Sequence, residues 1–452
     1  MTQPAVRTHV PGWCDPERVF LAHARHRAGE THDGWPDLVW LDAGPDAREG
    51  FSYVGLDVEP ALTTWYDVRA AIQTSAPRAG THHASALGRF ALGWVGWRAY
   101  DSEACFARVN TVIEFDHARH EVNVLTCTGE DATQRARALI AEASDSDQSI
   151  SDPMVSDQHD PASYNVTQRA RGGSWRQTDD EYLANIEACR SEIAAGNAYQ
   201  LCLTNTYRVD APFDQQSALA VYRSLRRENP SHHGAFISLN NTALLSSSPE
   251  IFLSVSASGR VVTKPIKGTR PRGATEQADR ALRDELANNP KERAENVMIV
   301  DLMRNDLSRV AVEGSVAVDT LLAVESYANV HQLVSTVSAQ LRSECTAEDA
   351  IDACFPAGSM TGAPKISAMQ ILAELEGGPR GIYSGAYGFL GEDGSAELAM
   401  VIRSLIIDHT GARLGSGGGI TIDSDPEEEL AEMHLKAEPL LRALGQADTP
   451  VI

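Results

Sequence analysis

The sequence lacks the features that would mark a disulfide-linked, zinc-binding or membrane protein. Its seven cysteines form no Cys-x-x-Cys pair and have no regular spacing, so neither a disulfide framework nor a zinc site is predicted. No apolar run approaches the length of a membrane span, and the N-terminus has no basic segment followed by an apolar core. We therefore expect a cytoplasmic protein that lies in a reducing compartment and does not contact a membrane.

Positive charge is also scarce. The chain has 39 Lys and Arg residues against 62 Asp and Glu residues, a formal net charge of -23. Such a surface repels phosphate backbones, so nucleic acids and anionic membranes are not predicted partners. An anionic small substrate would need a metal ion or a local cationic pocket. The 452 residues suffice for two or three domains or for one large two-lobed unit.

The chain divides into three regions by composition. Residues 1–140 alternate short apolar segments with turn residues, which predicts several strands with helices between them. Residues 141–176 are rich in Asp and Ser and predict a linker, with disorder as the favoured description. From 177 to 445 the order strand, helix, strand recurs without a fixed-period repeat.

Two helix starts in the last region are acidic. In the first, Asn289 is placed to cap the helix, Pro290 takes the first position and Glu292 the third. Glu292 is therefore either a capping glutamate or a ligand. Glu295, one turn further along the same face, has no capping role.

The second acidic helix start is capped by Asp425 and followed by Glu429, Glu432 and Lys436 on one stripe. One interpretation is a solvent-exposed Glu432–Lys436 pair worth about 0.3–0.5 kcal/mol. The other is that the two Glu-x-x-Glu helices face each other and supply oxygen ligands. Carboxylates without His or Cys suit Mg²⁺.

Glycine-rich segments suggest close approaches to the backbone. Gly358, Ser359 and Thr361 precede a helix predicted to start near Pro364, which indicates either a carboxylate-binding helix start or a plain turn capped by Thr361. Gly417–Gly419 enter a predicted strand, where glycine usually means that another group approaches closely.

Two cations stand in unusual places. Arg403 interrupts the apolar strand predicted in "ELAMVIRSLIIDHT", so it either faces outward or meets a buried anion, and its apolar neighbours favour the anion. In "RVVTKPIKGTRPRG" a strand is predicted to break at Pro265 and Gly268 into a basic loop. Lys267 is then either a solvated loop lysine or a partly desolvated amine that can be neutral and nucleophilic.

In chain order these segments resemble the chorismate-utilising enzymes, the family of the anthranilate, aminodeoxychorismate, isochorismate and salicylate synthases. The motifs that carry the resemblance are "PIKGTRPRG", "RAENVMIVDLMRNDLSRV", "VHQLVSTVSAQL", "FPAGSMTGAPK", "YSGAYGFL", "VIRSL" and "GSGGGI", within residues 178–442. Residues 1–140 resemble the N-terminal region of the aminating members, and residues 177–445 their chorismate-binding catalytic region. The implied fold is α+β, with two large, mostly antiparallel β-sheets stacked face to face, helices outside and the site between the sheets.

The resemblance also implies roles for individual residues. Glu295 and Glu432 match the principal Mg²⁺ ligands, with Glu292 and Glu429 in support. Glu250, in "SSSPEIFL", matches a general acid and base at the substrate hydroxyl. The residues that match substrate contacts are Arg403, Tyr383, His331, Ser359, Gly358, Gly418 and Lys436.

Lys267 distinguishes the subfamilies. Anthranilate synthases carry "PIAGT" here, whereas the members that aminate C4, aminodeoxychorismate synthase component I, carry "PIKGT". The resemblance implies that the lysine amine adds at ring C2 as the C4 hydroxyl leaves, and that ammonia then enters C4. The product, 4-amino-4-deoxychorismate, leads to 4-aminobenzoate and folate.

Two alternatives remain. Anthranilate synthase component I, which aminates C2 with loss of pyruvate, is disfavoured by Lys267. A catalytically silent protein that binds chorismate or tryptophan is disfavoured because it would need neither Lys267 nor Glu250.

The resemblance implies that ammonia comes from a separate glutamine amidotransferase subunit. The chain has no Gly-x-Cys-x-Gly nucleophile elbow, since Cys127 in "VLTCTGE" lacks the first glycine. We also expect no pyruvate-eliminating domain after residue 445, and therefore a product that keeps its enolpyruvyl group.

Overall fold

A computed structural model describes residues 5–29, 34–75, 89–101, 103–145, 172–327 and 330–446. Most of the predicted linker, residues 146–171, lies outside these ranges. Residues 141–145 complete a helix, and residues 174–175 form a short strand. None of the described helices is both long and apolar enough to cross a membrane.

The larger of two β-sheets runs in the order β1-β8-β7-β3-β2-β11-β12-β21-β22-β10-β18, with β9 beside β10. Its strands are β1 (Val6–Val10), β2 (Leu38–Asp42), β3 (Phe51–Gly55), β7 (Thr111–Asp116), β8 (Glu121–Thr126), β9 (Ser174–Trp175), β10 (Gln200–Val209), β11 (His233–Leu239), β12 (Thr242–Ser248), β18 (Gly362–Ala363), β21 (Ser404–Asp408) and β22 (Gly411–Ile420).

The smaller sheet runs in the order β15-β17-β14-β13-β20-β19-β5-β6-β4, with β16 beside β17. Its strands are β4 (Leu62–Thr64), β5 (Gly93–Arg98), β6 (Glu103–Val109), β13 (Ile251–Val255), β14 (Arg260–Thr263), β15 (Ile266–Pro271), β16 (Ala317–Ser326), β17 (Val330–Gln340), β19 (Ala386–Gly391) and β20 (Ala396–Met400). In the described parts of both sheets every strand pairing is antiparallel.

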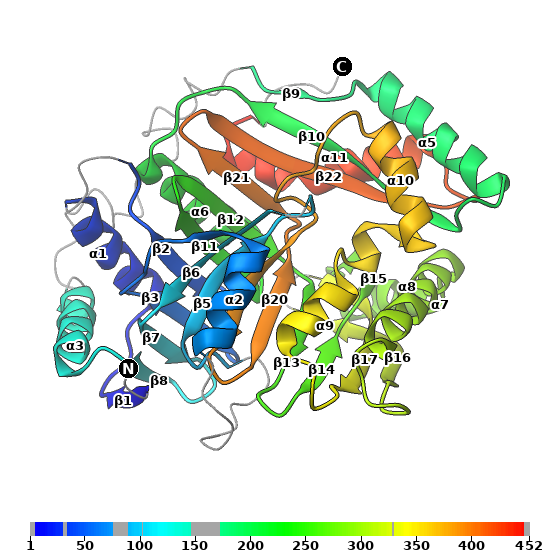
Figure 1. Ribbon diagram of the computed structural model, residues 1–452. Coiled ribbons are helices and arrows are strands. Elements are labelled where there is room, and N and C mark those ends of the chain that lie inside the picture. Colours follow the sequence, from blue (N-terminus) through cyan, green and yellow to red (C-terminus); the bar gives the residue numbers. More distant parts are fainter. Residues whose placement is uncertain are drawn as a thin grey trace.

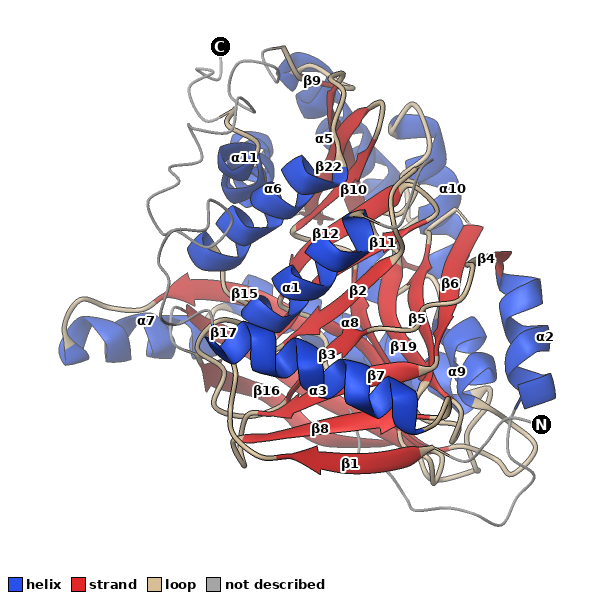
Figure 2. Ribbon diagram, turned by 90° about the vertical axis from the view of Figure 1, so that its left-hand side faces the viewer, coloured by secondary structure: helices blue, strands red, loops and turns tan. Residues whose placement is uncertain are grey.

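Helices cover the outer faces of the sheets, as Figures 1 and 2 show. They are α1 (Pro16–Ala28), α2 (Trp65–Ser75), α3 (Glu130–Asp145), α5 (Asp179–Ala194), α6 (Gln215–Glu228), α7 (Glu276–Asn288), α8 (Pro290–Ser308), α9 (Ala347–Cys354), α10 (Lys365–Leu375) and α11 (Pro426–Ala443), with a 3₁₀ turn, η3 (Gly358–Met360). Buried side chains of α1, α3, α6 and α11 pack on the larger sheet, and those of α8 and α9 on the smaller one.

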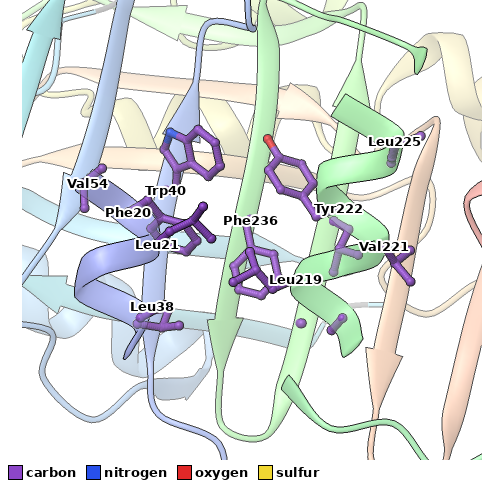
Figure 3. Close-up of a cluster of buried hydrophobic side chains, with 14 of the residues drawn as sticks. Phe20, Leu21, Leu38, Trp40, Val54, Leu219, Val221, Tyr222, Leu225 and Phe236 are labelled. Atoms are coloured by element: carbon purple, nitrogen blue, oxygen red, sulfur yellow. The ribbon is translucent and has the colours of Figure 1, made fainter. Parts of the chain in front are cut away.

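The packing follows from the period-two geometry of strands. On β2, Leu38 and Trp40 belong to the cluster under α1 and α6, whereas Val39 belongs to the core between the sheets. Figure 3 shows Trp40 and Phe236 beneath the two helices. Because β2 and β11 are buried on both faces, their sequences are almost wholly apolar. Each fully buried Phe or Leu contributes about 1.5–3 kcal/mol relative to an exposed one.

The predicted fold class is confirmed: the chain is α+β, with two stacked antiparallel sheets and helices outside. The N-terminal strands contribute to both sheets, with β1, β2, β3, β7 and β8 in the larger and β4, β5 and β6 in the smaller. The boundary at residue 140 therefore separates regions of sequence and not layers of structure.

Both acidic helix starts form as predicted. The Asn289 side chain accepts a hydrogen bond from the Glu292 N–H at the start of α8, and Pro290 is the first residue of that helix. Asp425 accepts from the N–H groups of Glu427 and Glu428 at the start of α11. These caps fix the first turn of each helix, and the Glu-x-x-Glu pairs lie within the first two turns.

Candidate active site

Two of the points at which the chain crosses from one sheet to the other are adjacent, and each of these two carries a predicted site residue. Glu250 lies between β12 and β13, and Arg403 lies between β20 and β21. The Ser247 N–H donates to the Arg403 carbonyl (3.1 Å), and the Met400 N–H donates to the Glu250 carbonyl (3.0 Å). These two hydrogen bonds hold the crossings side by side.

Arg403 does not interrupt a strand, so that prediction was wrong. It has a φ of 51° and occupies the turn by which the backbone changes sheets. A non-glycine residue in this left-handed region costs about 1–3 kcal/mol, and such strain clusters at functional sites. Burial lowers the pKa of Arg403, with Tyr383 and Glu432 opposing that shift.

Glu250 is poised to exchange a proton near neutral pH. Its side chain is buried, with 8% of the residue exposed, and burial raises its pKa to about 7. A hydrogen bond from Ser359 and the charge of Lys267 favour the ionised form but do not outweigh burial. A group with this pKa can both donate and accept a proton at physiological pH.

Lys267 lies in a strand, β15, and not in the predicted basic loop. β15 pairs with β17, and the register is interrupted between Lys267 and Thr269. Gly268, at the interruption, has a φ of 79°, and a Cβ there would lie 2.8 Å from the Glu292 carboxyl carbon. Glycine therefore allows both the bulge and the close approach of α8.

The Lys267 amine is held next to a buried carboxylate. Its Nζ is 3.3 Å from Glu295 Oε2, and Gln200 Nε2 donates to the same oxygen at 3.2 Å. Burial favours the neutral amine, but the charges of Glu295 and Glu250 outweigh burial and raise the pKa of Lys267. The nearby carboxylates therefore favour the charged form of the amine, whereas the interpretation of Lys267 as a nucleophile requires the neutral form.

Each of the four glutamates predicted to bind Mg²⁺ has a cationic partner. The pairs are Glu292–Arg270 (3.4 Å), Glu295–Lys267 (3.3 Å), Glu429–Lys291 (2.8 Å) and Glu432–Lys436 (2.6 Å). Because Lys291 belongs to α8 and Glu429 to α11, the two acidic helix starts face each other as one interpretation required. Among the described residues, no three His, Cys, Asp or Glu side chains are grouped as metal ligands.

The glutamates nevertheless lie close enough to influence one another. Burial raises the pKa of Glu292, and the charges of Glu295 and Glu432 raise it further. Burial also opposes ionisation of Glu432, but Lys436, Lys291 and Lys267 together lower its pKa. A set of carboxylates without His or Cys fits a hard cation such as Mg²⁺ by its chemistry. In this structure the negative charges of the four glutamates are balanced by the lysine and arginine side chains paired with them.

The predicted carboxylate-binding residues adjoin these glutamates. Arg403 Nη1 donates to the Lys436 carbonyl (3.3 Å), and Lys436 Nζ donates to the Gly417 carbonyl (2.9 Å). The Tyr383 ring lies so close to Gly415 that a Cβ on the glycine would overlap it. Tyr383 is buried, and burial raises the pKa of its phenol.

The glycine run of β22 explains why small residues are required there. A Cβ on Gly418 would lie 3.0 Å from Glu429 Oε2 and 3.8 Å from Lys436 Nζ. A Cβ on Gly419 would overlap the Gln200 amide and lie 3.3 Å from Lys267 Nζ. The expectation that another group approaches this backbone is confirmed.

The loop that carries Gly358 and Ser359 packs tightly on α8. A Cβ on Gly358 would overlap Leu302 of that helix. Thr361 Oγ1 donates to the Ala357 carbonyl (3.2 Å) and does not cap α10, whose N-cap position is Pro364. The loop therefore stabilises itself and leaves the start of α10 without a side-chain cap.

The hydrogen bonds of His331 are to residues outside the predicted site. Its two ring nitrogens hydrogen-bond to Ser326 Oγ (2.7 Å) and Asp279 Oδ1 (3.1 Å). Arg272 forms two further hydrogen bonds with Asp279, each 2.8 Å long. This cluster joins β17 to α7 and does not include Lys267 or Glu250.

Sequence reasoning missed Gln200, Arg380 and Gly415. Gln200 begins β10 and donates to Glu295, and its buried Oε1 has no hydrogen-bond partner among the described residues. A polar residue at the start of the apolar segment "QLCL" was the available signal. Gly415 opens the motif "GSGGGI", of which only the three consecutive glycines were singled out. Arg380 gave no signal, because an arginine in the turn-like sequence "GGPRG" is ordinary.

A cavity of about 400 Å³ lies on the opposite side of β15 from the Lys267 amine. Pro249 and Ile251 line it, while Glu250 between them does not, and Ile266 lines it, while Lys267 does not. Backbone alternation therefore directs the two candidate catalytic side chains away from the cavity.

Comparisons with known proteins agree with this architecture. The profile of the family described as chorismate binding enzyme matches residues 57–442. The chain superimposes on the crystal structure of anthranilate synthase component I from Streptococcus pneumoniae with a TM-score of 0.73 and 24% identity. That alignment covers 96% of this chain and 100% of the other.

Two curated relatives differ in the length they share with the chain. An aminodeoxychorismate synthase of Streptomyces griseus is 42% identical over 406 residues, which are 86% of this chain and 54% of that protein. Anthranilate synthase component 1 2 of Haloarcula marismortui is 32% identical over 485 residues, covering 95% and 87%. The chain thus spans about half the length of the Streptomyces protein. With a family profile that matches most of its residues and a relative matched nearly end to end, the chain belongs to the family of chorismate binding enzymes.

Proposed function

We propose that the chain aminates chorismate at C4 with ammonia and releases 4-amino-4-deoxychorismate for 4-aminobenzoate and folate synthesis. The observation that carries the proposal is the buried Lys267 amine beside Glu295, with the Glu250 carboxyl, whose pKa is about 7, next to it. The similarity to aminodeoxychorismate synthases at 42% identity supports it.

The first displacement needs a free amine and a proton donor. The reactive form of Lys267 is the neutral amine, which forms when the extra proton of the ammonium passes to solvent. Its lone pair forms a bond to ring C2, and the two ring double bonds shift. The C4 hydroxyl leaves as water with the proton of Glu250, which becomes a carboxylate. The lysine nitrogen, now bonded to C2, carries a positive charge.

The second displacement restores both residues. Ammonia forms a bond to C4, the double bonds shift back, and Lys267 leaves C2 as a neutral amine with its electron pair. The new C4 ammonium gives its proton to Glu250. The sum is chorismate plus ammonia giving 4-amino-4-deoxychorismate plus water, with enzyme residues unchanged.

The remaining residues bind and orient the substrate in this proposal. Arg403 and Tyr383 hold one substrate carboxylate with help from the backbone at Gly418, and Ser359 and its loop enclose the ring. Glu295 and Glu432, supported by Glu292 and Glu429, would hold Mg²⁺, which supplies charge neutralisation for the other carboxylate. Lys436 lies near the metal-bound carboxylate of the substrate in this proposal. The contact of His331 with the substrate ring remains a prediction.

Ammonia is proposed to come from a glutamine amidotransferase subunit, in the cytoplasm. Anthranilate synthase component I is the second candidate, favoured by the relative from Haloarcula that the chain matches nearly end to end. Lys267 argues against that candidate because an enzyme that adds ammonia directly at C2 needs no second nucleophile.

The test supplies the chain with chorismate, Mg²⁺ and ammonium at alkaline pH and identifies the product by chromatography and mass spectrometry. We expect 4-amino-4-deoxychorismate without pyruvate, and no turnover with glutamine until a glutaminase is added. Formation of anthranilate and pyruvate would establish the second candidate. Absence of any aminated product would overturn both.

A further inference from the structure

Arg380, between α10 and β19, is a buried arginine that uses all five of its N–H donors. Its Nε and Nη2 donate to the two Glu376 oxygens (2.8 and 2.6 Å), and Nη2 also donates to the Cys202 carbonyl (2.8 Å). Its Nη1 donates to the Met360 carbonyl (2.6 Å) and to Ser384 Oγ (3.4 Å). Only 6% of Arg380 is exposed. A guanidinium has five N–H donors in a fixed plane, whereas a lysine has three on one nitrogen.

The bond to Met360 fastens the loop that carries Ser359. Met360 ends the 3₁₀ turn η3, and Ser359 is its direct neighbour. Ser359 in turn hydrogen-bonds to the Glu250 carboxyl. The contacts therefore run from Arg380 through the backbone of Met360 and the side chain of Ser359 to the candidate acid and base.

The other bonds fasten the same loop to the sheet behind it. Cys202 lies on β10, and its N–H donates to the Thr361 carbonyl (2.9 Å). Glu376 accepts from both the N–H and the hydroxyl of Thr204 on β10, each at 2.9 Å. Arg380 and Glu376 thus join the end of α10, strand β10 and turn η3 at one point.

A second buried arginine, Arg226, forms ion pairs of the same kind without contacting the loop that carries Ser359. Arg226 is equally buried, at 5% exposed, pairs with Asp42 (2.6 Å) and Glu17 (2.8 Å), and lies over the Trp40 ring. Its ion-pair partners belong to β2 and α1, and these ion pairs do not involve the loop of residues 358–361. Arg226 therefore serves as a matched control: a buried ion pair of the same chemistry that holds no site loop.

We propose that Arg380 is a positioning residue that holds Ser359 against Glu250 by fixing the Met360 carbonyl. Its effect on turnover rests on the proposed function, whereas its effect on the loop does not. Replacement by lysine keeps the charge but loses at least two of the five hydrogen bonds. The loop should then loosen, and Ser359 should no longer meet Glu250 in one fixed geometry.

The test is a double-mutant cycle of Arg380→Lys with Ser359→Ala, read in kcat and KM for chorismate with ammonium. If Arg380 acts through Ser359, Arg380→Lys should lower kcat about tenfold or more in the wild type but much less in the Ser359→Ala background. Arg226→Lys should lower thermal stability, leave kcat near its wild-type value and add independently to Ser359→Ala. Additive effects in the Arg380 cycle would overturn the proposal.

Hydrogen exchange separates this proposal from the proposed function. Amides of residues 358–361 should exchange faster in Arg380→Lys than in the wild type or Arg226→Lys, whether or not the wild type aminates chorismate. Unchanged exchange there would overturn the proposal, while a wild type without aminating activity would overturn only the function. If Arg380→Lys does not fold, Glu376→Asp, which draws the guanidinium away from Met360, is tested with the same expectations.

Discussion

Replacing Glu250 by glutamine should stabilise the protein at high pH, because burial of this carboxyl opposes its ionisation. Its pKa is raised from 4.5 to about 7 in the folded chain. When folding raises the pKa of a carboxyl group, the contribution of that group to the free energy of unfolding is fully present below its pKa in the unfolded chain. The contribution is lost as the pH rises through its pKa in the folded chain. The difference of about 2.5 units corresponds to about 3.4 kcal/mol between the two limits.

Most of this loss falls in an accessible range of pH. With these two pKa values, about 2.5 kcal/mol of the stability of the wild type should be lost between pH 5 and pH 8 through Glu250 alone. Glu250→Gln cannot ionise, so its free energy of unfolding should rise relative to the wild type by that amount over the same range. Loss of the hydrogen bond with Ser359 adds an offset, and only the change with pH is diagnostic.

Urea unfolding of the ligand-free chain at pH 5 and pH 8 measures this difference. Glu313→Gln, at an exposed turn position, controls for the loss of a carboxylate elsewhere. A gap between Glu250→Gln and the wild type that does not widen from pH 5 to pH 8 would refute the assignment of a raised pKa. The same variant should lose turnover, because its amide can neither donate nor accept the required proton.

Three further changes follow from the site. Lys267→Ala should lose C4 amination by several powers of ten, about 4 kcal/mol or more of barrier. The wild type given chorismate and Mg²⁺ without ammonia should show a covalent adduct on the Lys267 peptide by mass spectrometry, and the variant should not; near-normal turnover by the variant would contradict the covalent role. Glu295→Gln and Glu432→Gln should each abolish turnover while circular dichroism shows an intact fold, and full activity in either, or in excess chelator, would exclude the metal assignment. Gly415→Ala should lose about 1–3 kcal/mol by thermal unfolding because the new methyl group overlaps the tyrosine ring packed on it. Gly29→Ala, where a Cβ has only an ordinary contact, should cost less.

Local signals predicted the elements of the site better than their arrangement. The caps at Asn289 and Asp425 and the spacing of the glutamates placed both acidic turns correctly, because capping depends on adjacent residues. Arg403 was assigned to a strand because both flanks are apolar. Its flanks belong to two different sheets, which a single stretch of sequence cannot distinguish from one continuous strand.

The residues that escaped prediction act through distant partners. Cys202, which accepts from Arg380, lies 178 residues away in the chain, and Glu295, which accepts from Gln200, lies 95 residues away. Nothing near either residue in the sequence requires these contacts. The raised pKa of Lys267 has the same origin, because it depends on how closely α8 approaches β15.

The interleaving of the larger sheet affects how the chain is made. Strand β2 pairs with β11, and Ser238, which pairs with Leu38, is synthesised about 200 residues later. At roughly 5–20 residues per second of synthesis, the apolar edge of β2 stays without this partner for roughly 10–40 s. Strand β10 stays without its partner β22 for a similar time. Strand β22 carries Gly419, which lies beside the Lys267 amine. Nascent chains should therefore need chaperones, and chains that stop before residue 411 should aggregate and not persist as partial enzymes.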